Sequence, residues 1–101
     1  MNKEFKKWLS ELAEHPYPPD MVEHEMVGLW ILIKAMWAIN RENDYRIIMS
    51  DTGIILQIYP WGDLKMEFYF YSDHNNSEQE TLIKALEYVY DSIVKETDEL
   101  N

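Results

Sequence analysis

The fold is decided by the stretch Met26-Val27-Gly28-Leu29-Trp30-Ile31-Leu32-Ile33-Lys34-Ala35-Met36-Trp37-Ala38-Ile39. Lys34 is the only charged residue in this stretch. A helix that spans a membrane needs about 20 apolar residues, and this stretch is shorter. It therefore predicts a helix buried inside a globular domain, and the rest of the chain is organised around that helix.

The small and polar residues of this helix share one stripe when it is drawn at about 100° per residue: His24, Gly28, Lys34, Ala35, Ala38 and Arg41. Most other directions carry bulky apolar residues, whereas a surface helix has one apolar stripe. We therefore expect neighbours on at least two sides. The small residues allow one neighbour to approach closely, either another helix of this chain or the same helix of a second copy. A core helix is the favoured interpretation, and an oligomer seam or partner groove is the alternative.

Composition narrows the class of protein. The chain has 101 residues, which predicts a single domain spanning residues 1–101. It has no cysteine, which excludes disulfides and thiolate metal sites. No apolar signal core follows the first residues, so we expect a cytoplasmic protein. The net charge of −10 disfavours nucleic acid and anionic membranes as partners, and it is compatible with a basic protein partner.

The remaining segments complete an α+β domain. An apolar stripe predicts a first helix over Asn2–Glu14, which should dock on the central helix or on the sheet. Asp20 is expected to cap the central helix, with Glu23 as its capping-box partner. Strand-like runs follow at 45–50, 54–59 and 64–71, and Ser77 is expected to cap a last helix over 78–97. The order ααβββα, with short turns between the strands, predicts a three-stranded antiparallel meander packed with three helices around the central apolar helix.

The two hairpins determine which side chains share a face of the sheet. A three-residue loop at Pro60–Gly62 would direct one set of side chains to the core by pairing Ile58 with Leu64, Leu56 with Met66 and Ile54 with Phe68. The second face would then carry Ile55, Gln57, Tyr59, Lys65, Glu67, Tyr69 and Tyr71. The first hairpin stays open between two registers. A two-residue loop puts Ile47 and Met49 on the core face, and a three-residue loop puts Ile48 there.

The second face of the sheet is the most prominent candidate binding surface. It carries Ile55, Tyr59, Tyr69 and Tyr71, with Trp61 at the nearby turn. The solvated face of an antiparallel sheet is normally polar, and tyrosine and tryptophan are common in binding hot spots. One interpretation is a partner-binding or dimer face. The other is that the first helix crosses this face and buries it.

The last helix adds an acidic region that includes Glu87 and Asp91. It could present a negative ridge to a basic surface, or it could be a solvated face with ordinary pairs such as Glu80–Lys84. Catalysis and metal binding have little support. The chain has no phosphate-binding loop or nucleophile motif, and its three histidines, His15, His24 and His74, lack the spacing of a metal site. We therefore predict no enzyme activity, no metal and no cofactor.

These observations predict a small acidic protein–protein interaction module. An inhibitor or immunity-type protein, such as an accessory protein of a phage or mobile element, fits this description. The predicted partner-binding residues are Ile55, Tyr59, Trp61, Glu67, Tyr69, Tyr71, Glu87 and Asp91. A homodimer that uses the aromatic face or the central helix is the first alternative. A small-molecule binder or enzyme with a pocket between the central helix and the sheet is the second.

Overall fold

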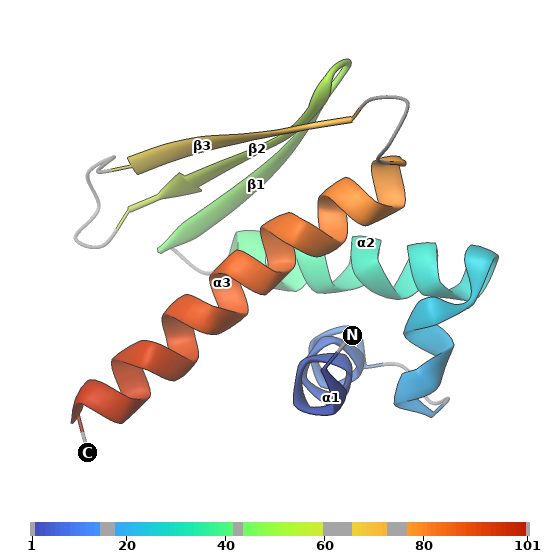
Figure 1. Cartoon of the computed structure of the whole chain (residues 1–101), viewed down its shortest axis with the longest axis horizontal. Helices are drawn as coiled ribbons and strands as arrows, with labels where there is room; N and C mark the ends of the chain where they lie inside the picture. The colour runs from blue at the N-terminus through green and yellow to red at the C-terminus, as the bar shows by residue number, and fades with distance from the viewer. Residues whose placement is uncertain (1, 15–17, 42–43, 60–65, 73–76, 101) are drawn as a thin grey trace.

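The computed structural model describes residues 2–14, 18–41, 44–59, 66–72 and 77–100, with side chains up to residue 94. The elements follow in the order α1 (Lys3–Leu12), a short 3₁₀ helix η1 (Pro19–Glu23), α2 (Glu25–Arg41), β1 (Tyr45–Ser50), β2 (Gly53–Ile58), β3 (Met66–Tyr71) and α3 (Glu78–Leu100). The strands form an antiparallel sheet in the order β1-β2-β3. The predicted α+β class and its element order are confirmed (Figure 1).

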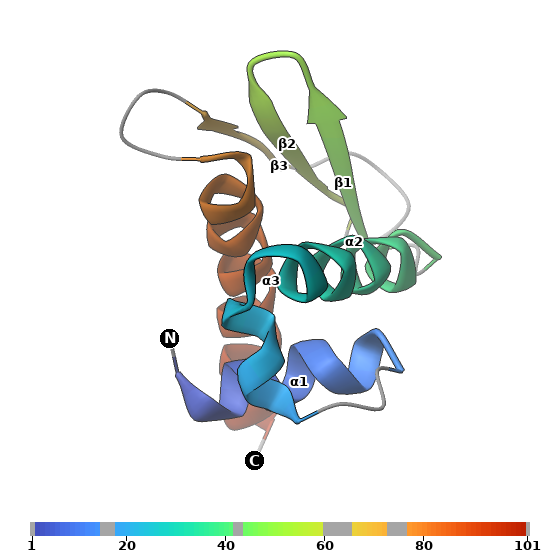
Figure 2. The ribbon, with the colours of Figure 1, turned by 90° about the vertical axis from the view of Figure 1, so that its right-hand side faces the viewer.

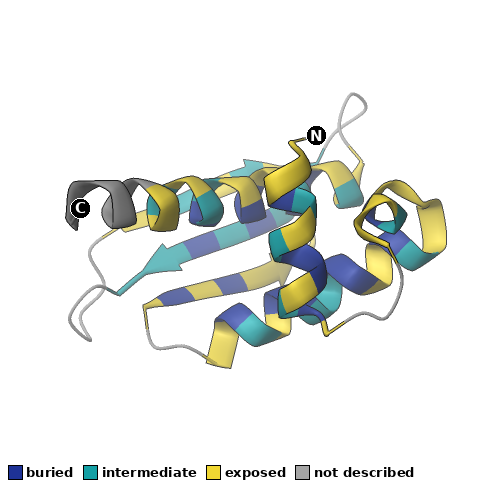
Figure 3. Cartoon of the chain, turned by 90° about the horizontal axis from the view of Figure 1, so that it is seen from below, coloured by how far each residue is buried: buried dark blue, intermediate teal, exposed yellow. Residues whose placement is uncertain are grey.

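The helices lie together beneath one face of the sheet (Figures 1 and 2). The central helix α2 packs against β1, α3, α1 and η1, and α3 packs beneath β2 and β3. The first helix α1 crosses below α2 and α3, on the side away from the sheet (Figure 3). It docks on α2, which is one of the two sites that its apolar stripe predicts.

The core lies where these elements meet. Phe5 and Leu9 of α1 are buried, and the Phe5 ring contacts Tyr90 of α3 at 5.5 Å between ring centroids. The sheet contributes alternate residues of β1 and β2, which is visible as alternating burial along those strands in Figure 3. The core residues with no exposed surface are Leu9, Val22, Ile31, Leu32, Ala35, Leu56, Leu82, Ala85, Leu86 and Val89.

The start of the central helix differs from the prediction. Asp20 does not cap α2, because residues 19–23 form η1 and His24 then adopts an extended backbone. The helix begins at Glu25, where the His24 Nδ1 atom accepts a hydrogen bond from the Val27 N–H at 3.3 Å. Asp20 instead accepts a hydrogen bond from the Lys6 ammonium at 3.1 Å, which raises the pKa of Lys6. Asp20 and Glu23 thus tie η1 to α1 through Lys6.

The other helix starts follow ordinary capping rules. Asn2 caps α1, since its Oδ1 atom accepts a hydrogen bond from the Glu4 N–H at 2.7 Å. The predicted cap at Ser77 is confirmed by a hydrogen bond from the Glu80 N–H to its Oγ atom at 3.2 Å.

The first hairpin has the two-residue loop, because Ser50 pairs with Gly53. Ile47 is therefore buried, while Ile48 lies on the face away from the helices. The predicted pairing of the second hairpin is wrong by two residues, since Ile58 pairs with Met66, Leu56 with Phe68 and Ile54 with Phe70. A shift of two residues leaves each side chain on the same face, so the predicted division between the two faces holds for the described residues. The turn at 60–62 lies outside them.

Candidate functional site

The outer face of the sheet is the surface that points away from the helices. It is formed by Arg46, Ile48, Ser50, Gly53, Ile55, Gln57, Glu67, Tyr69 and Tyr71, with Tyr59 directly after β2. Among the described segments, none crosses this face (Figures 1 and 2). The alternative prediction that the first helix buries it is therefore wrong. The apolar stripe of α1 packs against α2 and α3 instead.

The outer face is unusually aromatic and exposed. Tyr69 is 53% exposed, Tyr71 64% and Ile48 42%. The rings of Tyr69 and Tyr71 stack with 6.1 Å between centroids and 17° between planes. Ile48, Ile55 and Tyr69 lie opposite one another across the three strands. The solvent-exposed face of an antiparallel sheet usually carries polar residues, whereas this row is apolar.

Hydrogen bonds hold the polar side chains of the outer face in one arrangement. The Glu67 carboxylate accepts from the Gln57 amide at 2.7 Å and from the Tyr69 hydroxyl at 2.9 Å. The Tyr59 hydroxyl donates to the Gln57 Oε1 atom at 2.9 Å, and the Arg46 guanidinium lies 4.9 Å from the Tyr59 ring centroid. These contacts join Arg46, Gln57, Tyr59, Glu67 and Tyr69 into one network on the outer face.

The two hydrogen bonds shift the titration of Glu67. Donation from the Gln57 amide, followed by that from the Tyr69 hydroxyl, holds the pKa of the Glu67 carboxyl below its ordinary value. In return, Glu67 raises the pKa of Tyr69. A carboxyl whose pKa is lower in the folded than in the unfolded chain stabilises the fold above its unfolded pKa. That contribution is lost as the pH falls through the folded pKa.

We expect an NMR titration to show this shift directly. In the wild type, the Glu67 side-chain carbonyl should titrate below the ordinary range of a glutamate. Tyr69→Phe removes one donor and Gln57→Ala the other, so each should move the Glu67 pKa upward, and Gln57→Ala should move it further. An ordinary Glu67 pKa in the wild type would contradict the network.

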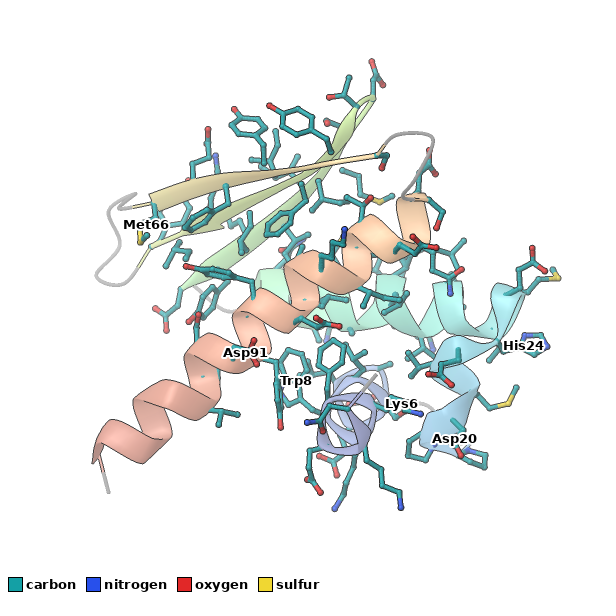
Figure 4. All side chains as sticks on the ribbon, viewed as in Figure 1. Lys6, Trp8, Asp20, His24, Met66 and Asp91 are labelled. Carbon is teal, nitrogen blue, oxygen red and sulfur yellow. The ribbon has the colours of Figure 1, made fainter. Side chains whose placement is uncertain are left out.

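The predicted site residues divide into two surfaces. Ile55, Tyr59, Glu67, Tyr69 and Tyr71 come together on the outer face, and Trp61 lies outside the described residues. Glu87 and Asp91 lie elsewhere, on α3, where they border a hollow of about 140 Å³ with Asn2, Phe5 and Tyr90. Figure 4 shows Asp91 on α3, below the sheet.

Five residues of the outer face are missing from the predicted set: Arg46, Ile48, Ser50, Gly53 and Gln57. Ile48 and Arg46 depend on the register of the first hairpin, which the sequence leaves open. Gln57 is placed on the correct face by the sequence pattern, but an isolated glutamine gives no sign that it joins Tyr59 to Glu67.

A second exposed apolar surface, the tryptophan stripe, lies on α2 and is formed by Met26, Leu29, Trp30 and Trp37. Trp30 and Trp37 are 48% and 47% exposed, and their rings meet edge to face at 5.8 Å between centroids. The Lys34 ammonium lies 5.5 Å from the Trp30 ring centroid. The central helix is thus covered on several sides, as predicted, but one side of it faces solvent.

A pocket of about 320 Å³ lies beside η1 and the first turn of α3, lined by Val22, Glu23, Glu25, Ser77, Gln79, Glu80 and Ile83. It does not lie between the central helix and the sheet, where the sequence suggested a ligand pocket. Within the described residues, no group of three histidine or acidic side chains is placed to hold a metal ion. No helix among these residues is long and apolar enough to cross a membrane.

The chain was compared with protein-family models, curated proteins and solved structures. No family model, curated protein or solved structure gave a significant match.

Proposed function

We propose that this chain is a protein-binding module that engages another protein through the outer face of its sheet. The observation that carries this proposal is the exposure of Tyr69 and Tyr71 on a face that no described helix covers. Tyrosines bury a large area on binding and keep a hydroxyl for hydrogen bonding. They are also enriched among the residues that dominate interface energies.

The arrangement of the outer face matches the usual anatomy of an interface. The apolar row of Ile48, Ile55 and Tyr69 lies at its centre. The polar groups Arg46, Gln57 and Glu67 flank that row on one side, and they are already hydrogen-bonded or stacked within the chain. An apolar centre with polar groups at its margin is typical of protein interfaces.

Charge favours a basic partner. The net charge of −10 attracts a positively charged protein and speeds its association at low salt. An inhibitor or immunity role is the form of binding that this chemistry fits, because a small acidic chain can cover a basic functional surface. Nucleic acid is disfavoured as a partner, since Arg46 is the only cation on the described outer face.

The test compares two pairs of exposed aromatic residues. The chain is used as bait in a lysate of its source cells, and captured proteins are quantified by mass spectrometry. We expect the double variant Tyr69→Ala/Tyr71→Ala to lose the specific partner while its melting temperature stays close to that of the wild type. The matched control, Trp30→Ala/Trp37→Ala, removes two comparably exposed rings from α2 and should retain the partner.

Salt provides a second readout of the same capture. Capture of a basic partner should weaken as ionic strength rises, because screening reduces attraction between exposed charges. Capture that survives the tyrosine changes but is lost with the tryptophan changes would contradict the proposed role of the outer face.

A further inference from the structure

The two edges of the sheet are not equivalent. Edge strands carry backbone N–H and C=O groups that lack a neighbouring strand. On β1, the side chain of Asn40 fills this position, since its Oδ1 atom accepts from the Ile47 N–H at 2.7 Å. Its Nδ2 atom donates to the Ile47 carbonyl at 2.9 Å. The middle of the β1 edge is therefore paired by α2 of the same chain.

The backbone of β3 has no such partner among the described residues. The Ser72 N–H donates to the Thr52 carbonyl at 2.9 Å, which fixes the alternation of hydrogen-bonded pairs between β2 and β3. Residues 66, 68 and 70 therefore bond to β2. The N–H and C=O groups of Glu67, Tyr69 and Tyr71 point to the open edge.

The composition of β3 favours pairing of this open edge with another strand. Its sequence, Met66-Glu67-Phe68-Tyr69-Phe70-Tyr71, has four aromatic residues, one charge and no proline. Short segments of high strand propensity and low charge pair readily with one another. Natural sheets usually protect such an edge with charges, proline or a covering segment.

We propose that β3 pairs antiparallel with β3 of a second copy of this chain, about a two-fold axis at Tyr69. Tyr69 then pairs with the second copy's Tyr69, and Glu67 with the second copy's Tyr71, with two hydrogen bonds in each pair. In this register all three outward-facing residues of β3 pair among themselves. The two sheets join into one, and the tyrosines of both copies form a continuous outer face.

Charge and chemistry select this register over its neighbours. A two-fold axis at Glu67 would place two carboxylates opposite each other, which is destabilising. In the proposed register Glu67 faces a tyrosine, and a tyrosine hydroxyl already donates to Glu67 within one chain. The contact repeats the same surface on both copies and closes on itself, as a two-fold interface does. The pairing does not depend on the proposed function, because it needs no other protein.

The test is the mass of the purified full chain by sedimentation equilibrium, from micromolar to millimolar concentration. Two matched variants share the loss of the Tyr71 ring and introduce charges of opposite sign. Tyr71→Lys places a cation opposite the second copy's Glu67, and Tyr71→Glu places a second carboxylate there. We expect the dimer dissociation constant of Tyr71→Glu to be about tenfold higher than that of Tyr71→Lys.

A second pair of variants tests the backbone of the edge. Tyr69→Pro removes the outward N–H of β3 without removing a hydrogen bond to β2, and proline is tolerated at such edge positions. It should give a folded monomer by circular dichroism. Tyr69→Val retains the N–H and should still dimerise.

Three results would overturn the pairing. One is a wild-type chain that stays monomeric up to millimolar concentration. Another is equal dimerisation by the two Tyr71 variants. The third is a dimer that persists in folded Tyr69→Pro and is lost in Trp30→Ala/Trp37→Ala, which would place self-association on α2.

Discussion

Replacing Phe5 by alanine is expected to destabilise the fold by about 3–5 kcal/mol, the usual cost of removing a buried aromatic ring. Phe5 is 2% exposed, and its ring contacts Trp8 at 6.0 Å and Tyr90 at 5.5 Å between centroids. It joins α1 to α3, so its loss leaves a cavity between two elements far apart in the sequence. Because domains of this size are stable by roughly 5–15 kcal/mol, the change removes a large share of the total.

Chemical denaturation, followed by circular dichroism, measures this effect. The control is Phe5→Leu, which keeps most of the buried volume and should cost clearly less. A change in the free energy of unfolding near zero for Phe5→Ala would mean that α1 does not dock against α2 and α3. The helix would then be free to cover another surface, including the outer face.

Replacing Gly28 by alanine should also destabilise the fold, although such a change normally stabilises a helix by about 0.5–1 kcal/mol. A Cβ atom at Gly28 would collide with the Val22 carbonyl oxygen of η1. Since the Val22 oxygen belongs to the backbone and the Cβ position is fixed by the backbone of α2, the clash is relieved only by moving η1 away from α2. We expect a net loss of about 1–3 kcal/mol in the free energy of unfolding, as for other overpacked sites.

Helix propensity alone would make Gly28→Ala stabilising, whereas the clash with η1 makes it destabilising. Thermal and urea unfolding should both show lower stability for Gly28→Ala. The reverse change at another position of the same helix, the half-buried Ala38→Gly, serves as a reference for helix propensity, with an expected propensity cost of about 1 kcal/mol. An increase in stability for Gly28→Ala would show that η1 does not approach the start of α2 as described.

The class of the fold could be predicted from the sequence because its signals are local. The run from Met26 to Ile39 identifies the central helix. The alternation of side chains along a strand places Ile54 and Leu56 on one face of the sheet and Ile55 and Gln57 on the other, whatever the length of the next loop. The same alternation explains why a pairing error of two residues did no harm to the face assignment. The predicted pairing is wrong because it makes Pro60–Gly62 the whole connection, whereas β3 begins at Met66.

Whether a given surface stays exposed could not be predicted, because exposure depends on where the helices dock. The stripe of Phe5 and Leu9 would fit the outer face of the sheet as well as it fits α2. A helix that is apolar in most directions, as α2 is, gives no sign that Trp30 and Trp37 face water. The predicted N-cap at Asp20 is wrong for a similar reason, since the Asp20 side chain makes a tertiary contact with Lys6 instead.

The exposure of the outer face is tested most directly by hydroxyl-radical oxidation of the purified chain. Mass spectrometry measures the rate at which each tyrosine is oxidised. The helices that pack on one face of the sheet leave Tyr69 and Tyr71 open on the other, while Tyr45 is buried at 9% exposure. We expect Tyr69 and Tyr71 to be oxidised several-fold faster than Tyr45. Equal protection of all three would mean that the outer face is covered within the chain, and it would contradict the proposed binding surface.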